Sequence, residues 1–328
     1  MQTRARGKRV PPAPGARPDR REVRPFLKWA GGKRQLLPHL RRFYPVQFGT
    51  YFEPFVGSGA VFFDLHGRGL LEGHDAVLID NNGDLVGCLR VVRDQVDVLI
   101  RRLKRLAKER EDRPHEHYYE VRDRRFNPIR RRLHEQNGRS FADAYTPELA
   151  AMLIYLNRTG FNGLFRQNAQ GGFNVPIGRY VNPRICDAAN LRQVAAAFAR
   201  ARTRILLGDF SAVLTEAKKG DFVYFDPPYA PMSTTASFTA YTADGFGEEG
   251  QCRLQRVVVE LAQRGCQVVL SNSTAPVIER LYERDETVRR AGLRAYRVPA
   301  RRAINSDASA RGHILEYIIT NVPRREGE

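Results

Sequence analysis

Short apolar runs, rich in β-branched and aromatic residues, recur along the chain from Phe26 onward, and periodic helical stretches such as 190–201 and 251–263 separate several of them. The runs lie at 51–56, 76–80, 204–208, 221–225, 266–271, 294–299 and 313–320. Because strands that alternate with helices build a mostly parallel sheet covered on both faces, we predict a doubly wound α/β fold with seven strands. Only a polar loop, 300–312, joins the last two runs, which predicts that they form an antiparallel pair.

The alternation stops after the second run, where the chain becomes charged and helical. Helices are expected at 85–110, 116–136 and 146–157. The Gly- and Asn-rich stretch TGFNGLFRQNAQGGFNVPIGRY, which follows them, is typical of a hairpin. We therefore predict a domain of residues 85–184 inserted between the second and third strands, so that the sheet domain comprises 25–84 and 185–328. Residues 1–24 are rich in Pro and Arg with little to bury, which predicts a disordered basic tail.

The charge of the chain is strongly positive and unevenly distributed. Of its 328 residues 42% are apolar and 27% are charged, and the formal net charge is +18. Segment 1–24 carries +6 and segment 90–179 carries +8, whereas 25–89 is neutral. A localised positive field is typical of proteins that bind a polyanion, above all nucleic acid. An Arg-rich proteome is the alternative explanation, but a uniform bias would not leave one segment neutral.

The sequence carries no sign of a membrane or secreted protein. No run approaches the roughly 18 apolar residues of a membrane span, and the first residues lack the apolar segment of a secretory signal. The cysteines stand far apart without a CxxC pair, which indicates neither a zinc site nor a disulfide framework. They are Cys88, Cys186, Cys252 and Cys266. We expect a soluble cytoplasmic protein with reduced thiols, no membrane partner and no metal.

A glycine motif follows the first predicted strand. The segment YFEPFVGSGAVF places Phe55, Gly57 and Gly59 where the strand turns into a helix, and glycines there let the backbone approach a ligand. Asp80 ends the next apolar run, 21 residues beyond Gly59, where a carboxylate can accept hydrogen bonds from ribose hydroxyls. A helix cap or turn is the alternative role for Asp80. The motif lacks the third glycine of a dinucleotide fingerprint, so NAD and S-adenosylmethionine both stay open as cofactors.

The segment PFLKWAGGKRQLL (25–37) combines the only tryptophan, Trp29, with two glycines and two lysines. This composition disfavours a helix and predicts a tight loop that leads into one. The segment is not a P-loop, because Gly31-Gly32-Lys33 is followed by Arg34 and lacks the upstream glycine. Ordinary core packing is the alternative role for Trp29.

The run DFVYF leads into Asp226-Pro227-Pro228-Tyr229. The two prolines cannot donate to a sheet ladder and fix an extended turn at the edge of the sheet where ligands bind in open α/β folds. There the Asp226 carboxylate and the Pro227 carbonyl can accept both N–H groups of a base amine and turn its lone pair toward an electrophilic methyl group. The Tyr229 ring can stack on an extruded base. We predict Asp226, Pro227 and Tyr229 as catalytic residues, with a purely structural turn as the alternative.

The motifs KWAGGK, FVGSG, NRTGFNGLFRQNAQGGFNVPIGRY and DPPY together resemble the Dam-type DNA adenine-N6 methyltransferases, the D12 class of α-group amino-methyltransferases, over about residues 25–320. The resemblance implies the fold of the S-adenosylmethionine-dependent methyltransferases and makes the inserted domain the target-recognition domain. It implies double-stranded DNA as partner, a flipped adenine methylated at N6, and GATC as the target. It also implies a monomeric, bacterial or phage-type, nucleoid-associated enzyme, with a cognate restriction endonuclease as a candidate partner.

The same resemblance assigns site residues. It places the cofactor at Trp29, Lys33, Phe55, Gly57, Gly59, Asp80, Asp209, Phe210 and Asp226. It places DNA contacts at Lys28, Phe161, Asn162, Leu164, Arg166, Asn174 and Pro176. Arg166 can pair bidentately with guanine, worth about 1–3 kcal/mol of discrimination, and a phosphate contact is the alternative. Leu164 and Pro176 suit a thymine methyl or packing within the hairpin, and the Ser/Thr-rich loop 231–242 is expected to cover the flipped base or bind phosphates.

Other functions remain open at this point. DPPY-like tetrapeptides also serve cytosine N4, so a DNA cytosine-N4 methyltransferase is an alternative. A catalytically inactive DNA-binding homologue is a second alternative, and an NAD-dependent oxidoreductase is a third. Cytosine C5 methylation is disfavoured, because the sequence has no Pro-Cys pair to supply a nucleophile.

Overall fold

The computed structural model describes residues 23–33, 35–232, 246–301 and 313–325. Most of the predicted basic tail, most of the Ser/Thr-rich loop and most of the polar loop between the last two strands therefore lie outside the described residues.

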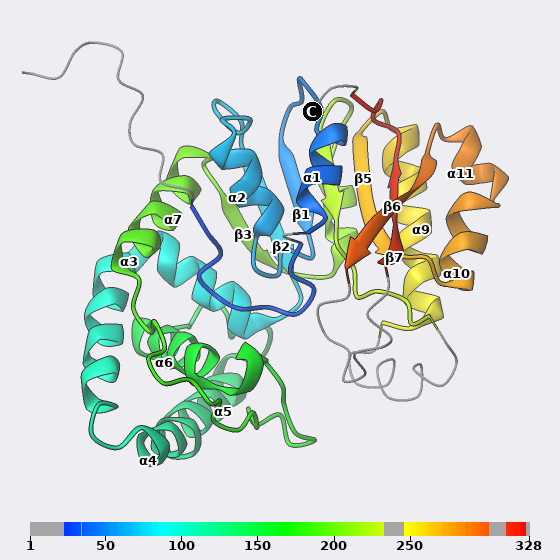
Figure 1. Ribbon diagram of the computed structural model, residues 1–328. Helices are drawn as coiled ribbons and strands as arrows, with labels where there is room; N and C mark the ends of the chain where they lie inside the picture. Colours follow the sequence, from blue (N-terminus) through cyan, green and yellow to red (C-terminus); the bar gives the residue numbers. More distant parts are fainter. Residues whose placement is uncertain (1–22, 34, 233–245, 302–312, 326–328) are drawn as a thin grey trace, which may run out of the picture.

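Within the described residues, the strands form one seven-stranded sheet in the order β3-β2-β1-β4-β5-β7-β6 (Figure 1). They are β1 (Tyr51–Pro54), β2 (Ala76–Asp80), β3 (Arg204–Leu207), β4 (Phe222–Phe225), β5 (Gln267–Ser273), β6 (Arg294–Arg301) and β7 (His313–Thr320). Strands β1 to β5 are parallel, and β7 runs antiparallel to both β5 and β6. The seven predicted strands, the mostly parallel sheet and the antiparallel final pair are thus confirmed.

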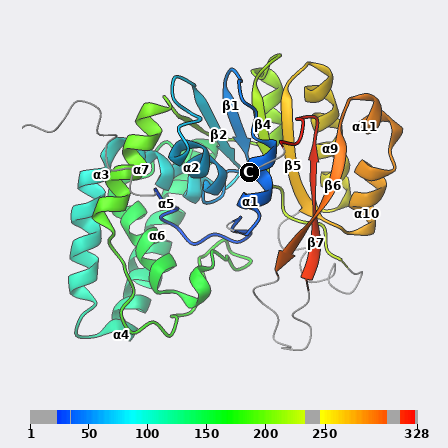
Figure 2. The ribbon, with the colours of Figure 1, turned by 45° about the horizontal axis from the view of Figure 1, so that its top comes forward.

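Successive side chains along each strand point to opposite faces of the sheet, so apolar strands present apolar side chains on both faces. Helices cover both faces and bury these side chains. In β2, Leu78 joins one apolar cluster, and Val77 and Ile79 join the other. The first cluster includes side chains of α1 (Leu37–Leu40), η1 (Arg41–Phe43), α2 (Ala60–Gly67), α3 (Gly83–Glu109) and α7 (Ala188–Arg200). The second includes side chains of η5 (Phe210–Thr215), α9 (Glu248–Gln263), α10 (Pro276–Ile278), η6 (Glu279–Glu283) and α11 (Glu286–Arg290). Figure 2 shows these two groups of helices on opposite sides of the sheet.

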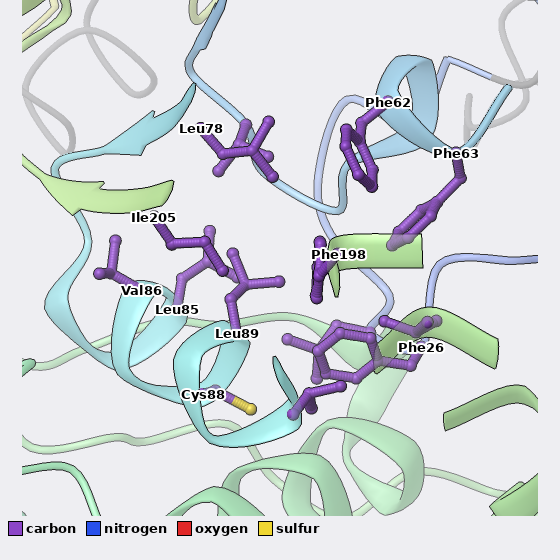
Figure 3. Close-up of a cluster of buried hydrophobic side chains, with 14 of the residues drawn as sticks. Phe26, Phe62, Phe63, Leu78, Leu85, Val86, Cys88, Leu89, Phe198 and Ile205 are labelled. Atoms are coloured by element: carbon purple, nitrogen blue, oxygen red, sulfur yellow. The ribbon is translucent and has the colours of Figure 1, made fainter. Parts of the chain in front are cut away.

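The first cluster is dominated by aromatic and branched side chains. Figure 3 shows Phe62 and Phe63 of α2 facing Phe198 of α7, with Leu85 and Leu89 of α3 alongside. The same cluster continues into the segment between β2 and β3, so the insertion shares a core with the sheet. None of the helices in the described ranges is long and apolar enough to cross a membrane.

The insertion between β2 and β3 is helical, as predicted, but differs in two details. It consists of α3, α4 (Pro114–Tyr119), the π-helix η2 (Glu120–Phe126), α5 (Asn127–Asn137), η3 (Gly138–Ser140), α6 (Pro147–Thr159) and η4 (Phe161–Gly163). The single helix expected at 116–136 is therefore interrupted by a π-helical turn. Residues 160–178, here called the hairpin loop, form two isolated antiparallel bridges, Gly160 to Ile177 and Gln167 to Phe173, in place of a regular two-stranded ladder.

Candidate active site

The Asp226 carboxylate is held in a partly buried ion pair at the carboxyl edge of β4. Lys33 Nζ lies 2.7 Å from its Oδ1, and Ser271 Oγ donates to the same oxygen at 3.2 Å. Burial raises the pKa of Asp226, and the Lys33 ammonium and the Ser271 hydroxyl oppose this rise. The ion pair with Lys33 and the hydrogen bond from Ser271 therefore favour the ionised carboxylate against the effect of burial.

The Tyr229 side chain is fixed at its ring and at its hydroxyl. The Lys33 ammonium lies 4.4 Å from the ring centroid, and the hydroxyl donates to Glu316 Oε2 of β7 at 3.1 Å. Burial, followed by the negative charges of Asp226 and Glu316, raises the pKa of Tyr229 well above its ordinary value. The phenol therefore stays protonated and remains a hydrogen-bond donor.

The backbone of the DPPY motif is anchored to β5 and α9. Gln251 Nε2 donates to the Pro228 carbonyl at 2.9 Å, and Ser273 Oγ donates to the Ala230 carbonyl at 2.5 Å. Asn272 Oδ1 accepts from the Ala230 amide at 3.3 Å. Within the part of the chain that the structure describes, these bonds leave the Pro227 carbonyl without a partner, so it remains available as an acceptor beside Asp226.

The glycine motif turns sharply between β1 and α2. Gly57 and Gly59 have φ of 49° and 70°, in the left-handed region that favours glycine, and Phe55 has a strained φ of 103°. The Gly57 amide donates to Asp80 Oδ2 at 3.1 Å, while Asp80 Oδ1 accepts from the Asn82 amide at 2.9 Å. Asp80 therefore ties the glycine loop to the end of β2, and burial raises its pKa despite these bonds.

An aromatic wall adjoins the glycine loop. The rings of Phe55 and Phe210 stack with centroids 5.2 Å apart, and Phe246 meets both edge-on. The Arg253 guanidinium lies 5.0 Å from the centroid of Phe210 and pairs with Asp209 Oδ1 at 2.7 Å. The structure thus brings Asp209 and Phe210 together with Phe55, and their assignment to the cofactor stays a prediction.

The loop that carries Lys28 and Trp29 lies against the insertion. Trp29 stacks on Phe165, with centroids 5.5 Å apart, and a Cβ added to Gly57 would come within 3.2 Å of the Trp29 ring. Lys28 Nζ donates to the Tyr180 hydroxyl at 3.0 Å. Trp29 therefore contacts the glycine motif on one side and the hairpin loop on the other, and it also packs against the first apolar cluster.

The residues assigned to DNA cluster on the hairpin loop. Arg166 Nε donates to Asn174 Oδ1 at 2.9 Å on the surface of the protein. Phe161 and Leu164 expose 49% and 39% of their surface although both are large and apolar. Asn162 adopts a left-handed φ of 53°, and Pro176 is exposed. The predicted set is thus brought to one loop, apart from Lys28, which approaches it from the N-terminal side.

Three polar side chains at the site were not predicted from the sequence. Glu53 of β1 accepts from the Tyr51 hydroxyl at 2.9 Å and from the Phe62 amide at 3.2 Å, and burial raises its pKa to about 8. Ser271 and Glu316 complete the surroundings of Asp226 and Tyr229. Glu53 and Glu316 could have been found, because each is an acid inside an otherwise apolar run, whereas nothing in the sequence around Ser271 marks it.

A glycine loop after β1, an acid at the end of β2, a DPPY turn after β4 and an antiparallel β7 define a methyltransferase of the S-adenosylmethionine-dependent class. The model of the D12 class N6 adenine-specific DNA methyltransferases matches residues 29–296, and the chain belongs to that family. The described residues contain no group of three or more His, Cys, Asp or Glu placed to hold a metal ion.

Named relatives agree with the family. The chain is 38% identical over 299 residues to the Type II methyltransferase M1.LlaDCHI of Lactococcus lactis subsp. cremoris, covering 91% of this chain and 95% of the relative. It is 39% identical over 311 residues to the Type II methyltransferase M.MjaIII of Methanocaldococcus jannaschii, covering 92% and 99%. It is 32% identical over 304 residues to the DNA adenine methylase of Escherichia coli K12, covering 92% and 96%.

The protein is therefore an adenine-specific DNA methyltransferase, as the motifs predicted, and S-adenosylmethionine is the methyl donor of this class. The family favours adenine N6 over the cytosine N4 alternative and over an inactive binding module or an oxidoreductase.

Proposed function

We propose that the enzyme extrudes the target adenine from double-stranded DNA and binds its amine at the DPPY turn, with GATC as the target sequence. The observation that carries the proposal is the Asp226 carboxylate, partly buried and paired with Lys33, beside the Pro227 carbonyl, which accepts no hydrogen bond from the residues that the structure describes. The two acceptors suit a group with two N–H donors, and an amine inside a base pair cannot reach them.

In the proposed mechanism, the residues of the DPPY turn orient the adenine amine and stabilise the charge that develops on it. The Oδ2 atom of Asp226 and the Pro227 carbonyl accept the two amine hydrogens, which turns the nitrogen lone pair out of the plane of the base. When bound, S-adenosylmethionine supplies the electrophilic methyl group. As the N–C bond forms and the S–C bond of the donor breaks, the ionised Asp226 carboxylate stabilises the positive charge on the nitrogen, and the amine proton bonded to Asp226 Oδ2 then leaves to solvent. The Tyr229 ring, fixed by Glu316, supports the base.

The residues near the glycine loop suit this cofactor. The partly exposed Phe55 ring, stacked on the buried Phe210, suits an apolar contact with a purine, and the partly buried Asp80 carboxylate suits ribose hydroxyls. The tight turn at Gly57 and Gly59 lets the backbone come close to a ligand. We assign the cofactor to these residues together with Trp29, Lys33 and Asp209.

The hairpin loop is proposed to enter the major groove. Arg166, oriented by Asn174, would read a guanine, and the exposed Leu164 and Pro176 would meet a thymine methyl. The exposed Phe161 and Asn162 and the nearby Lys28 complete the contact set. The excess of +8 in residues 90–179 supports this placement, because phosphates surround any groove that the loop could enter.

Substituting Asp226 with Asn tests the proposed chemistry. It keeps the size of the side chain and removes its charge, and we expect kcat on a GATC duplex to fall by about 10²- to 10⁴-fold while DNA binding survives. Asp75→Asn, at an exposed carboxylate that pairs with Arg202, is the matched control. Full activity of Asp226→Asn would remove this residue from the mechanism, and mass analysis of nucleosides identifies the product.

A second test concerns the target sequence. Arg166→Ala should relax discrimination at one base pair of GATC, measured on duplexes that each carry a single substitution. A uniform loss of affinity on all duplexes would instead make Arg166 a phosphate contact. Methylation of plasmid at sites other than GATC, read out with nucleases of different methylation sensitivity, would replace the proposed target.

We also propose that residues 85–184 form the target-recognition domain and that 25–84 with 185–328 form the catalytic domain. The enzyme is proposed to act as a monomer in the cytoplasm, where its DNA is. Two relatives are named Type II methyltransferases, which supports a restriction endonuclease with the same target as a functional partner. Analytical sedimentation at working concentration tests the monomeric state. Cleavage of unmethylated DNA by an extract of the host cells tests for the restriction endonuclease.

A further inference from the structure

The second half of the hairpin loop, residues 173–178, here called the return strand, is bonded by side chains of the adjacent helical segment of the insertion. Asn127 makes two bonds to Phe173: its Nδ2 donates to the Phe173 carbonyl at 3.0 Å, and its Oδ1 accepts from the Phe173 amide at 2.9 Å. Two residues on, the Val175 carbonyl accepts from the Tyr118 hydroxyl at 2.8 Å and from Arg122 Nη1 at 3.0 Å. Side chains of the helices thus bond the backbone of Phe173 and Val175, while the Asn174 amide between them bonds the Arg166 carbonyl across the loop.

A third connection lies at the turn of the hairpin loop. The Arg130 guanidinium, almost fully buried, donates through Nη1 to the Gly171 carbonyl and through Nε to Asp84 Oδ2 at 2.7 Å. The Tyr145 hydroxyl donates to the other oxygen of Asp84 at 3.2 Å. Because Asp84 lies in the first turn of α3, this buried pair ties the turn of the hairpin loop to the helix that follows Asp80.

The π-helix η2 explains how one side of the helical segment can supply all these bonds. Tyr118 and Asn127 are nine residues apart, which is about 2.5 turns of an α-helix, so they would otherwise lie on opposite sides. A π-helical turn contains one more residue per hydrogen-bonded ring and changes the phase of everything after it. Residues 120–126 form such a turn, and Asn127 and Arg130 consequently face the same strand as Tyr118 and Arg122.

The bonds determine which residues of the hairpin loop face outward. Phe173 and Val175, whose backbone is bonded, bury their side chains, at 2% and 1% exposure. Asn174 lies between them, reaches Arg166 with its side chain, and also donates its amide to the Arg166 carbonyl at 3.1 Å. A slip of one residue along the strand would exchange the buried and outward sets.

We propose that Tyr118, Arg122, Asn127 and Arg130 are positioning residues for target recognition, brought into line by the π-helical turn at 120–126. They act through Arg166 and Asn174 and touch neither base nor phosphate. The proposal rests on the proposed role of the hairpin loop in reading DNA, and it extends the set of residues that determine specificity to the interior of the inserted domain.

The test compares discrimination between substrates. Tyr118→Phe removes one hydroxyl, and Asn127→Leu removes both bonds to Phe173. For each variant, kcat/KM is measured on a GATC duplex and on duplexes with one substituted base pair. We expect the ratio of the two values to fall about 10-fold for Asn127→Leu and less for Tyr118→Phe. Affinity for S-adenosylmethionine and the slope of log DNA affinity against log salt should stay at wild-type values, since no phosphate contact is lost.

Two comparisons make the result decisive. Arg124→Ala and Arg131→Ala remove exposed arginines from the same helical segment and should leave discrimination unchanged. If Asn174→Ala abolishes the discrimination, the double variant Asn174→Ala/Asn127→Leu should lose no more discrimination than Asn174→Ala alone, because both residues act on the same strand. Wild-type discrimination in both Asn127→Leu and Tyr118→Phe overturns the proposal. Unchanged discrimination in Asn174→Ala and Arg166→Ala would instead overturn the role proposed for the hairpin loop.

Discussion

Lys33 and Asp226 form an ion pair of 2.7 Å, although Lys33 precedes the first strand of the sheet and Asp226 follows the fourth. The lysine lowers the pKa of a carboxyl that burial raises, and the same ammonium lies over the Tyr229 ring. The N-terminal loop thus controls the charge state of the residue to which we assign catalysis.

Replacing Lys33 with Met should therefore change the pH dependence of methyl transfer. Without the ammonium, only the Ser271 hydrogen bond still opposes burial and the pKa of Asp226 rises, so the ionised acceptor is populated only at higher pH. The ascending limb of the kcat profile should move toward alkaline pH, and activity at neutral pH should fall at least several-fold. Lys28→Met, on the same loop but bonded to Tyr180, is the control: as a proposed DNA contact it should lower affinity for DNA and leave the position of the ascending limb unchanged. An ascending limb at the wild-type position would contradict the electrostatic role.

Glu53 should make the folded state less stable as pH rises. Its pKa is about 8 in the folded protein and 4.5 in the ordinary state, so folding favours the protonated acid. The stabilisation is complete below about pH 4.5 and is lost as pH rises through 8, with a slope of at most about 1.4 kcal/mol per pH unit. Glu53→Gln keeps a neutral side chain at every pH. Its free energy of unfolding should therefore increase relative to that of the wild type as pH rises from 4.5 to about 8.

Urea titrations at pH 5, 6.5 and 8 measure this difference. Glu249→Gln, in the exposed first turn of α9, provides the comparison. A constant difference in the free energy of unfolding between Glu53→Gln and wild type across this range would show that Glu53 is already ionised in the folded protein.

The contact between Trp29 and Phe165 should couple the hairpin loop to the cofactor site. An aromatic pair of this geometry contributes about 0.5–1.5 kcal/mol, so Phe165→Ala is expected to weaken S-adenosylmethionine binding by about 2- to 12-fold although Phe165 belongs to the insertion. Titration calorimetry without DNA measures the effect. Leu164→Ala, the exposed neighbour, should leave the cofactor affinity at the wild-type value; an equal loss in both variants would point to general disruption of the loop.

Two phenylalanines offer a matched test of packing. Phe62 is completely buried between Phe63 and Phe198, whereas Phe161 is half exposed. Phe62→Ala should cost about 3–5 kcal/mol of unfolding free energy, because it removes a large side chain and leaves a cavity. Phe161→Ala should change stability by less than about 0.5 kcal/mol and affect DNA binding instead. Chemical denaturation distinguishes them, and similar losses would mean that Phe161 is packed in solution.

Much of the fold was predictable because each strand is a short apolar run between polar turns. All seven runs became strands, and both Asp80 and Asp226 stand at the carboxyl ends of such runs, where parallel strands bring side chains to one edge. Glycine spacing and the two prolines fixed local backbone geometry, which depends on neighbours in the sequence. The strands and turns depend on residues close together in the sequence, so the sequence pattern predicts them.

What could not be predicted depends on contacts between distant segments. The pairing of Lys33 with Asp226 and the stacking of Trp29 on Phe165 arise only once the sheet and the insertion have assembled. The π-helical turn EVRDRRF carries no Gly or Pro to mark it. A hairpin was predicted where the structure has the irregular hairpin loop. The loop is irregular because side chains that lie far away in sequence, such as Asn127, bond its backbone.

The insertion leaves the sheet after β2 and returns to it at β3, and these two strands are parallel neighbours. A crossover between such strands can be lengthened without rethreading the sheet, since its ends stay where a short connecting helix would put them. With the division of roles proposed above, exchange of the insertion would change the choice of target while the catalytic domain stays the same. For protein engineering, a foreign module grafted at the same junction has to supply the side chains of the core that the insertion shares with the sheet.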